Sequence, residues 1–149
     1  MEGHTTVGQT FVLIKPDAVQ RRLVGEIVSR FERQGFVVRR MDSRRLAEAD
    51  VAEHYPHLAN EPFFPEIVAY MTSGPVVGMV LEAPNAVQAA RRIVGATDPM
   101  KAERGSIRGD LATSIRYNLV HAADSESAAR MEIGRFFSGA GDERNEGCR

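Results

Sequence analysis

The chain has 149 residues, of which 43% are hydrophobic and 26% charged, and its formal net charge at pH 7 is -1. A chain of this length can bury one packed core, and the composition is not that of a disordered or membrane-embedded protein. The near-neutral charge argues against the broad basic surface that drives nucleic-acid binding, whereas arginine clusters at 91–92 and 104–108 favour a small anionic ligand. We therefore expect a single domain over 1–149.

Cysteine content and the length of apolar runs indicate in which cellular compartment the protein is expected. The single cysteine, Cys148, allows neither a disulfide within the chain nor a zinc site built on cysteines. No stretch approaches the ~20 apolar residues of a membrane span, and residues 1–10 lack the apolar run of a secretory signal. These features predict a cytoplasmic protein that binds no membrane.

Hydrophobic spacing predicts strands and helices in alternation. Thr10–Ile14 is a β-branched and aromatic run that should end as a strand at Pro16, whose nitrogen cannot donate a hydrogen bond. Apolar residues then recur every three or four positions and predict one amphipathic helix over 18–34, closed by Gly35. The further expected elements are a strand over 36–41, helices over 47–54 and 65–72, a strand over 76–81, a helix capped by Asn85 and closed by Gly95, a loop over 97–116 and a strand over 117–122.

A last helix should follow, capped by Asp124 or Ser125, because either side chain can accept a hydrogen bond from a free N–H at a helix start. The apolar residues expected on one face of it are Ala129, Ile133, Phe136 and Phe137. The charged, glycine-rich tail from Ser138 onward is expected to be loose. The elements group as two strand–helix–strand units.

The most informative segment is 118–125, with the sequence NLVHAADS. It places His121 at a strand end just before a helix start, where free N–H groups and the helix dipole favour anions. If the strand and the helix pack together, Glu132 would hold one ring nitrogen as a donor and leave the other nucleophilic. Taken singly, a structural histidine and a solvated glutamate are the alternatives.

Several segments keep a common order and spacing over most of the chain, which makes them far more specific together than any one motif. They are 10–17 (TFVLIKPD), 23–35 (LVGEIVSRFERQG), 62–65 (PFFP), 70–77 (YMTSGPVV), 105–110 (GSIRGD) and 118–125 (NLVHAADS), followed by Glu132 and Ile133. In this set the chain resembles the nucleoside diphosphate kinase family.

The resemblance implies an α+β, ferredoxin-like fold: a four-stranded antiparallel sheet covered by helices, with a helical insert between strands two and three. It also implies a ping-pong phosphotransferase that moves the γ-phosphoryl group of a nucleoside triphosphate to a nucleoside diphosphate through a phosphohistidine. Mg²⁺ would enter bound to the nucleotide. The family forms homo-oligomers, and a hexamer is expected here, with a tetramer as the alternative.

By the same resemblance, His121 is the nucleophile and Glu132 orients it, and Lys15 and Tyr55 complete the catalytic set. The alternative for Tyr55, which precedes Pro56, is that it only covers the helical insert. The implied nucleotide-binding residues are Lys15, Phe63, Ile67, Arg91, Thr97, Arg108, Ile115 and Asn118. Phosphoryl transfer needs positive charge held against phosphate oxygens, which suits one lysine and two arginines.

The resemblance also places side chains around the nucleotide base. Phe63 matches the aromatic residue that stacks on the base, and Ile67 and Ile115 match positions that flank it, which predicts tolerance of any purine or pyrimidine. Core packing is the alternative for the two isoleucines. Asp124 either contacts a metal-bound water or only caps the last helix. The remaining histidines, interpreted as surface residues, are His4, His54 and His57.

The chain departs from the family pattern at Ala122 and Ala123, where Gly and Ser are usual. Ala123 lacks a hydroxyl beside the His–Glu pair, and a hydrogen bond worth about 0.5–1.5 kcal/mol would change the transfer rate roughly two- to tenfold. Ala122 is tolerable unless its backbone needs a positive φ. The two alanines leave open a nucleotide-binding or regulatory protein with weak or no transfer. An RNA-binding module on the same topology is disfavoured by the near-neutral charge.

Overall fold

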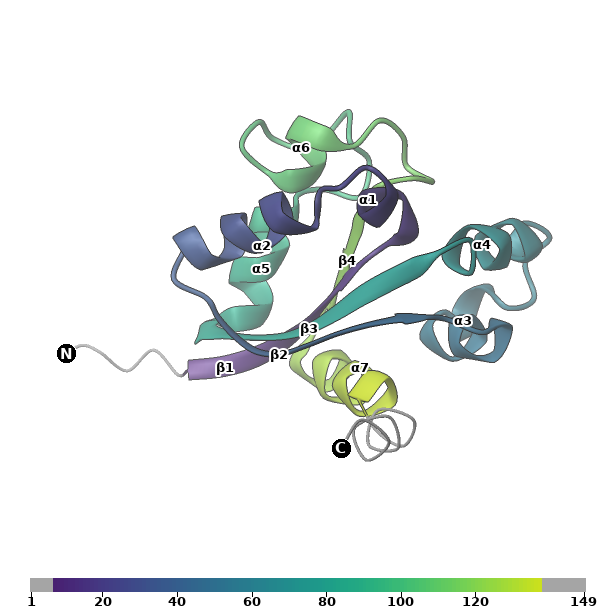
Figure 1. Cartoon of the computed structure of the whole chain (residues 1–149), viewed down its shortest axis with the longest axis horizontal. Coiled ribbons are helices and arrows are strands. Elements are labelled where there is room, and N and C mark those ends of the chain that lie inside the picture. The colour runs from purple at the N-terminus through teal and green to yellow at the C-terminus, as the bar shows by residue number, and fades with distance from the viewer. Residues whose placement is uncertain (1–6, 138–149) are drawn as a thin grey trace.

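A computed structural model describes residues 7–137 and shows an antiparallel sheet with helices on both faces (Figure 1). Its strands are β1 (Val7–Ile14), β2 (Val37–Arg45), β3 (Pro75–Pro84) and β4 (Val120–Ala122), in the spatial order β2-β3-β1-β4. Strand β1 pairs with β3 on one side and with β4 on the other. This order, with two strand–helix–strand units, is the ferredoxin-like arrangement, so the predicted fold class is confirmed.

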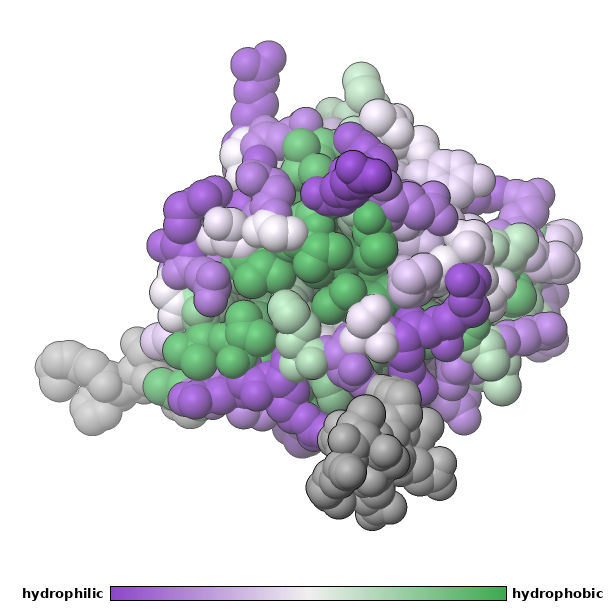
Figure 2. All heavy atoms as spheres, in the orientation of Figure 1, coloured by the Kyte–Doolittle hydropathy of each residue, from purple (hydrophilic) through white to green (hydrophobic). Residues whose placement is uncertain are grey.

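The two faces of the sheet carry different helices (Figure 1). One face is covered by α1 (Pro16–Gln20), α2 (Val24–Arg33), α5 (Ala86–Val94) and α6 (Ile107–Leu111). The other face packs against α7 (Glu126–Phe137) and the helical insert, which consists of α3 (Glu48–His54), the 3-10 turn η1 (Pro56–Leu58) and α4 (Phe64–Met71). Figure 2 shows apolar side chains gathered where α2 and α5 lie over the sheet. Val24, Val28 and Ile93 of these helices are partly buried against the core layer on this face.

Alternation along β1 divides the core into these two layers. Phe11 and Leu13 pack with the insert and α7, whereas Val12 and Ile14 pack with α2 and α5, as the two-residue period of a strand requires. Gly78 of β3 allows α7 to approach closely, because a Cβ at this position would lie 2.5 Å from the Phe136 ring. This close approach fixes α7, and with it Glu132, against the sheet.

The expected single helix over 18–34 is wrong, because the chain forms α1 and α2 with a turn between them. Arg22 has φ of 62° in this turn, and the N–H of Leu23 donates to the carbonyl of Ala18 at 2.9 Å. Val19 and Leu23 still pack on the same core layer, so the apolar spacing continues across the break. Periodicity alone therefore could not reveal it. Gly35, with φ of 94°, follows α2 as expected.

The second half of the chain differs from the predicted elements in three places. The expected loop over 97–116 contains α6, whose start is capped by Ser106 Oγ accepting from Gly109 N at 3.0 Å. The expected strand over 117–122 is shorter, because Leu119 has φ of 79° and pairing starts only at Val120. Asn85 precedes α5 as expected, but its backbone is left-handed and its side chain makes no cap bond.

The start of α7 is capped by Ser125, whose Oγ accepts from Ala128 N at 3.0 Å, so Asp124 is exposed and not needed as the cap. The predicted apolar face of this helix is confirmed, with Ala129, Phe136 and Phe137 buried and Ile133 packed against them. The tail from Ser138 lies outside the described residues. Within residues 7–137, none of the helices combines the length and apolar character needed to cross a bilayer.

Candidate active site

A cleft of about 430 Å³ lies where β4, the helical insert and the C-terminal end of α5 meet. Nine of the residues predicted for catalysis, nucleotide binding or metal contact line it: Lys15, Tyr55, Arg91, Thr97, Arg108, Asn118, His121, Asp124 and Glu132. They come from both halves of the chain, and the antiparallel pairing of β1 with β4 brings Lys15 to the segment that precedes His121.

His121 and Glu132 face each other across the contact between β4 and α7. His121 Nε2 lies 2.9 Å from Glu132 Oε1, and the two side chains are 22% and 11% exposed. A carboxylate can only accept a hydrogen bond, so the neutral imidazole carries its proton on Nε2 and keeps a lone pair on Nδ1. The packing of strand on helix therefore leaves the Nδ1 lone pair free of this contact.

Lys15 is held at the end of β1 by the turn before β4. Its Nζ donates to Asn118 Oδ1 at 2.9 Å, and its backbone N–H donates to the carbonyl of Leu119 at 2.8 Å. Asn118 in turn donates from Nδ2 to the carbonyl of Thr97 at 3.3 Å. The buried amide thus joins the lysine to the loop after α5.

The turn itself is tight, because Val120 N donates to Asn118 O at 2.9 Å while Leu119 has φ of 79°. A three-residue turn of this kind is rare and strained for a residue other than glycine. Leu119 is fully buried, so core packing fixes the turn that precedes His121.

Arg108 spans three segments around the cleft. It donates from Nε to Asn118 O at 3.3 Å, from Nη1 to Gly95 O at 3.0 Å and from Nη2 to Val120 O at 2.6 Å. A guanidinium has five N–H donors, so two remain for a ligand. Burial lowers the pKa of Arg108 to about 10, and the side chain keeps its charge at neutral pH. It therefore both closes the cleft and gives it positive charge.

Two aromatic side chains of the insert stand beside His121. Burial raises the pKa of Tyr55 to about 12, so its hydroxyl stays protonated, and its ring centroid lies 6.3 Å from that of His121. Burial, followed by repulsion from His121, lowers the pKa of His54 to about 4, and its ring stacks on Phe11 at 6.1 Å. Both side chains are therefore uncharged at neutral pH.

The interpretation of His54 as a surface residue is wrong, because it is half-buried and lines the cleft. The sequence did hold a signal: His54 lies three residues after the buried Val51, so both lie on one face of α3. His57 also lines the cleft but is exposed, as expected. His4 lies outside the described residues.

Phe63, Ile67 and Ile115 do not line the cleft. Phe63 and Ile115 are 37% and 57% exposed, whereas Ile67 packs against the core layer under the insert. Their segments are nevertheless joined to each other, by an ion pair between Arg116 and Glu66 and by the edge-to-face contact of Tyr70 with Tyr117 at 4.9 Å. Their expected contacts with a base stay predictions.

The two alanines after His121 fit the structure without strain. Among the described residues other than glycine, positive φ occurs at Arg22, Asn85 and Leu119, so Ala122 needs no glycine. Ala123 is fully buried in a small apolar cluster with Val87 and Ala129.

A histidine with a free ring nitrogen, beside one lysine and two arginines, defines a class of proteins that take up phosphoryl groups on histidine. Comparison with known proteins places the chain within that class. A family model described as nucleoside diphosphate kinase matches residues 8–141. The chain belongs to the nucleoside diphosphate kinase family. It is thus a kinase that transfers the γ-phosphoryl group of a nucleoside triphosphate to a nucleoside diphosphate.

Curated relatives and solved structures agree with the family model. The chain is 48% identical over 134 residues to a nucleoside diphosphate kinase from Frankia casuarinae, covering 90% of this chain and 98% of the relative. It is 46% identical over 132 residues to one from Mycobacterium leprae, covering 88% and 97%. The structure of a Halobacterium salinarum nucleoside diphosphate kinase in complex with CDP superposes with a TM-score of 0.86 at 40% identity, covering 91% of this chain and 90% of that one.

Proposed function

We propose that this kinase works through a phosphohistidine formed on Nδ1 of His121. The observation that carries the proposal is the 2.9 Å contact between His121 Nε2 and Glu132 Oε1, which fixes the tautomer and leaves Nδ1 free. Glu132 also offsets the positive charge that the ring gains when Nδ1 bonds to phosphorus, because the proton stays on Nε2.

The reaction then has two half-reactions. The Nδ1 lone pair of His121 attacks the γ-phosphorus of a nucleoside triphosphate, the bond to the β–γ bridging oxygen breaks, and the diphosphate leaves with that electron pair. A terminal oxygen of an acceptor diphosphate then attacks the phosphorus and the N–P bond breaks. Lys15, Arg91 and Arg108 supply positive charge to the phosphate oxygens, and the Tyr55 hydroxyl can donate to one of them.

The residues present fit a magnesium ion held mainly by the nucleotide. Glu132 is engaged with His121, and within residues 7–137 no group of three or more histidine, cysteine or carboxylate side chains is arranged to hold a metal ion. Asp124 is exposed at the cleft and can accept from a metal-bound water. When bound, the ion would neutralise charge on the phosphate oxygens.

We further infer that the partners are nucleoside triphosphates and diphosphates of any base, with Phe63 as the stacking platform between Ile67 and Ile115. The relative from Halobacterium salinarum was solved with CDP, which supports a nucleotide ligand of this kind. Assembly into a homohexamer, with a tetramer as the alternative, and a cytoplasmic location stay predictions.

The regulatory alternative rests only on Ala122 and Ala123, and the intact His121–Glu132 pair favours transfer. An RNA-binding module of this topology stacks bases on an open sheet face. Here helices cover both faces of the sheet, which gives that alternative no support.

The proposed mechanism predicts a phosphoenzyme. The protein is incubated with γ-labelled ATP and Mg²⁺, and label that is lost in acid but stable in alkali is expected, since a phosphorus–nitrogen bond is acid-labile. Unlabelled GDP should then chase the label into GTP. Nucleotide binding without label would support the regulatory alternative instead.

Nucleotide affinity should fall as pH rises through about 8. Burial, together with Arg108, lowers the pKa of Lys15 to about 8, while Asp17 opposes the shift. The free protein therefore loses the charge of Lys15 above that pH, and bound phosphate restores it. We expect the Kd for ADP to rise roughly tenfold between pH 7 and pH 9, by calorimetry. In Lys15→Arg the Kd should stay nearly level over this range, and equal slopes in both proteins would contradict the assignment.

A hydroxyl at position 123 should increase the rate. We expect Ala123→Ser to raise kcat roughly two- to tenfold, the effect of one added neutral hydrogen bond in the transition state. Because Ala123 is fully buried, thermal unfolding must be measured alongside the kinetics. A variant that is no faster, and that unfolds at a lower temperature, would show that the hydroxyl finds no partner and that Ala123 does not slow transfer.

A further inference from the structure

Arg108 can act in the cleft only if α6 holds it there. Helix α6 has five residues, and a helix this short has little stability of its own. It lies between loops on the face of the sheet covered by α2 and α5 (Figure 1). Contacts from elsewhere in the fold must therefore fix its position.

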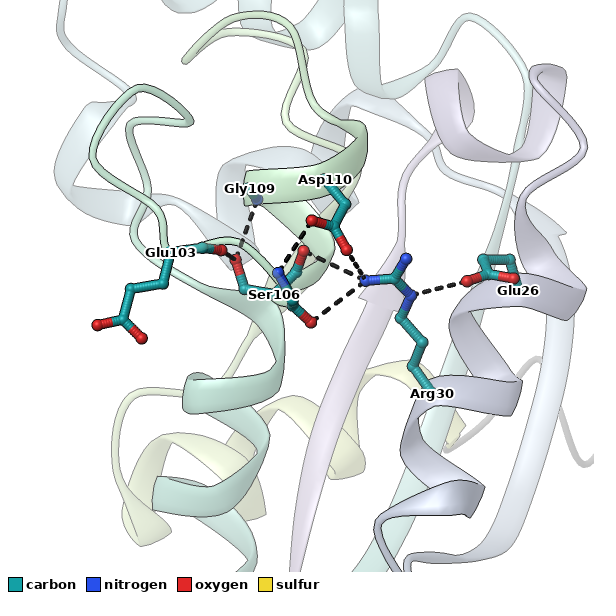
Figure 3. Close-up of polar contacts among 7 residues, drawn as sticks. Glu26, Arg30, Glu103, Ser106, Gly109 and Asp110 are labelled. Carbon is teal, nitrogen blue, oxygen red and sulfur yellow. Dashed lines mark hydrogen bonds and ion pairs between the residues drawn. The ribbon is translucent and has the colours of Figure 1, made fainter.

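Arg30 of α2 makes those contacts (Figure 3). Its Nη1 lies 2.8 Å from Asp110 Oδ2 and 3.3 Å from the carbonyl oxygens of both Gly105 and Ser106. Its Nε lies 2.8 Å from Glu26 Oε2, one turn earlier on α2. These contacts bridge α2 to the start and the end of α6. The Arg30 side chain is only 16% exposed, so the bridge is largely shielded from water.

The residues that accept hydrogen bonds from Arg30 are themselves fixed by further hydrogen bonds. Asp110 Oδ1 accepts from Gly105 N at 2.9 Å, and Ser106 Oγ donates to Glu103 O at 2.6 Å while it accepts from Gly109 N. A Cβ on Gly109 would lie 2.0 Å from the Glu103 carbonyl oxygen, so the loop and the helix pack backbone to backbone. The bond from Gly105 N–H, and then the one from Arg30, lower the pKa of Asp110 and keep it charged.

Arg30 itself does not reach the substrate cleft. It lines a separate cavity of about 300 Å³ with Arg33, Gln34, Ile93, Gly105 and Asp110, none of which lines the cleft that contains His121. Any effect of Arg30 on catalysis must therefore pass through α6, and Arg108 is the cleft residue that α6 carries.

We propose that Arg30 is a positioning residue for phosphoryl transfer: by bridging Glu26 to Asp110 and to the carbonyls of Gly105 and Ser106, it fixes α6 and thereby aims Arg108 into the cleft. The inference rests on the proposed role of Arg108 at the phosphates. Loss of the bridge leaves the chemistry of His121 intact and displaces one cation, which acts on the transferred group mainly in the transition state.

The test is a double-mutant cycle on the rate constant for phosphorylation of His121 by γ-labelled ATP. Single-turnover labelling is used because it remains measurable for slow variants. Arg30→Gln is expected to lower this rate about tenfold in the parent and less than about twofold in an Arg108→Ala background, since the cycle isolates action through Arg108. Arg33→Gln is the matched control, because Arg33 lies on the same helix and its Nη1 donates to Ser29 Oγ at 3.3 Å, one turn earlier on α2.

Arg30→Lys serves as the second variant if Arg30→Gln does not fold. It keeps a cation for Asp110 but cannot bridge Glu26 and both carbonyls, so an intermediate rate is expected. A parent rate in Arg30→Lys, or the same fold-loss from Arg30→Gln with and without Arg108, would overturn the proposal. If the parent protein itself takes no label, the phosphohistidine mechanism fails instead, so the two failures are distinguishable.

Discussion

Replacement of His121 by alanine should abolish phosphoenzyme formation and lower kcat by at least about 10⁴-fold, because the variant has no nucleophile on which to split the transfer into two steps. The Kd for ADP should change little, since the cations that contact phosphate remain in place. The measurement pairs acid-labile labelling from γ-labelled ATP with calorimetric binding of ADP.

The matched control is His57→Gln, which removes an exposed imidazole that also lines the cleft. It should still take acid-labile label. Label that persists in His121→Ala but disappears in His57→Gln would move the nucleophile to the insert, and the proposed roles of Glu132 and β4 would fall with it.

Removal of the Glu132 carboxylate should have the second largest effect. We expect Glu132→Ala to lower kcat roughly ten- to a hundredfold, because a hydrogen bond to a charged group contributes about 1.5–3 kcal/mol. The ring then loses the acceptor that holds its proton on Nε2, and the imidazolium formed in the reaction loses its counter-charge. Because Glu132 is bonded to His121 and not to the cations, the Kd for ADP should stay unchanged.

Glu132→Gln separates the two contributions. It keeps an oxygen that can accept from Nε2 but removes the charge, so a kcat between those of the parent and Glu132→Ala is expected. Glu126→Gln, an exposed change in the first turn of the same helix, is the control and should match the parent. Parent kcat in Glu132→Gln would show that orientation alone is sufficient.

Short-range pattern made much of the fold predictable. The β-branched run of β1, the apolar spacing of α7, and the glycines at 35 and 95 each act on their own few residues, so the sequence indicated them correctly. The sequence did not indicate the turn at Arg22, because the apolar spacing continues unchanged across it. It did not indicate α6 either, because a helix of five residues is too short to show a repeating apolar pattern.

The candidate site was likewise only partly predictable from the sequence. The position of His121 between a strand and a helix, and the resemblance to the family for Lys15, Arg91 and Arg108, pointed to these residues, and the structure places all of them along one cleft. The spacing could not show that Arg108 donates three hydrogen bonds to backbone carbonyls, or that His54 is half-buried beside His121. Those facts depend on which segments the packed sheet brings together.

The sequence by itself determined the family, the order of the four strands, and the side chains available for phosphoryl transfer, because these depend on local hydrogen bonding, turn chemistry and motif spacing. Only the tertiary structure decided which nitrogen of His121 is free, how Arg108 is aimed and which residue holds α6. Each of these follows from contacts between segments far apart in the chain, such as Glu132 with His121 and Arg30 with Asp110, which form only when both core layers pack on β1.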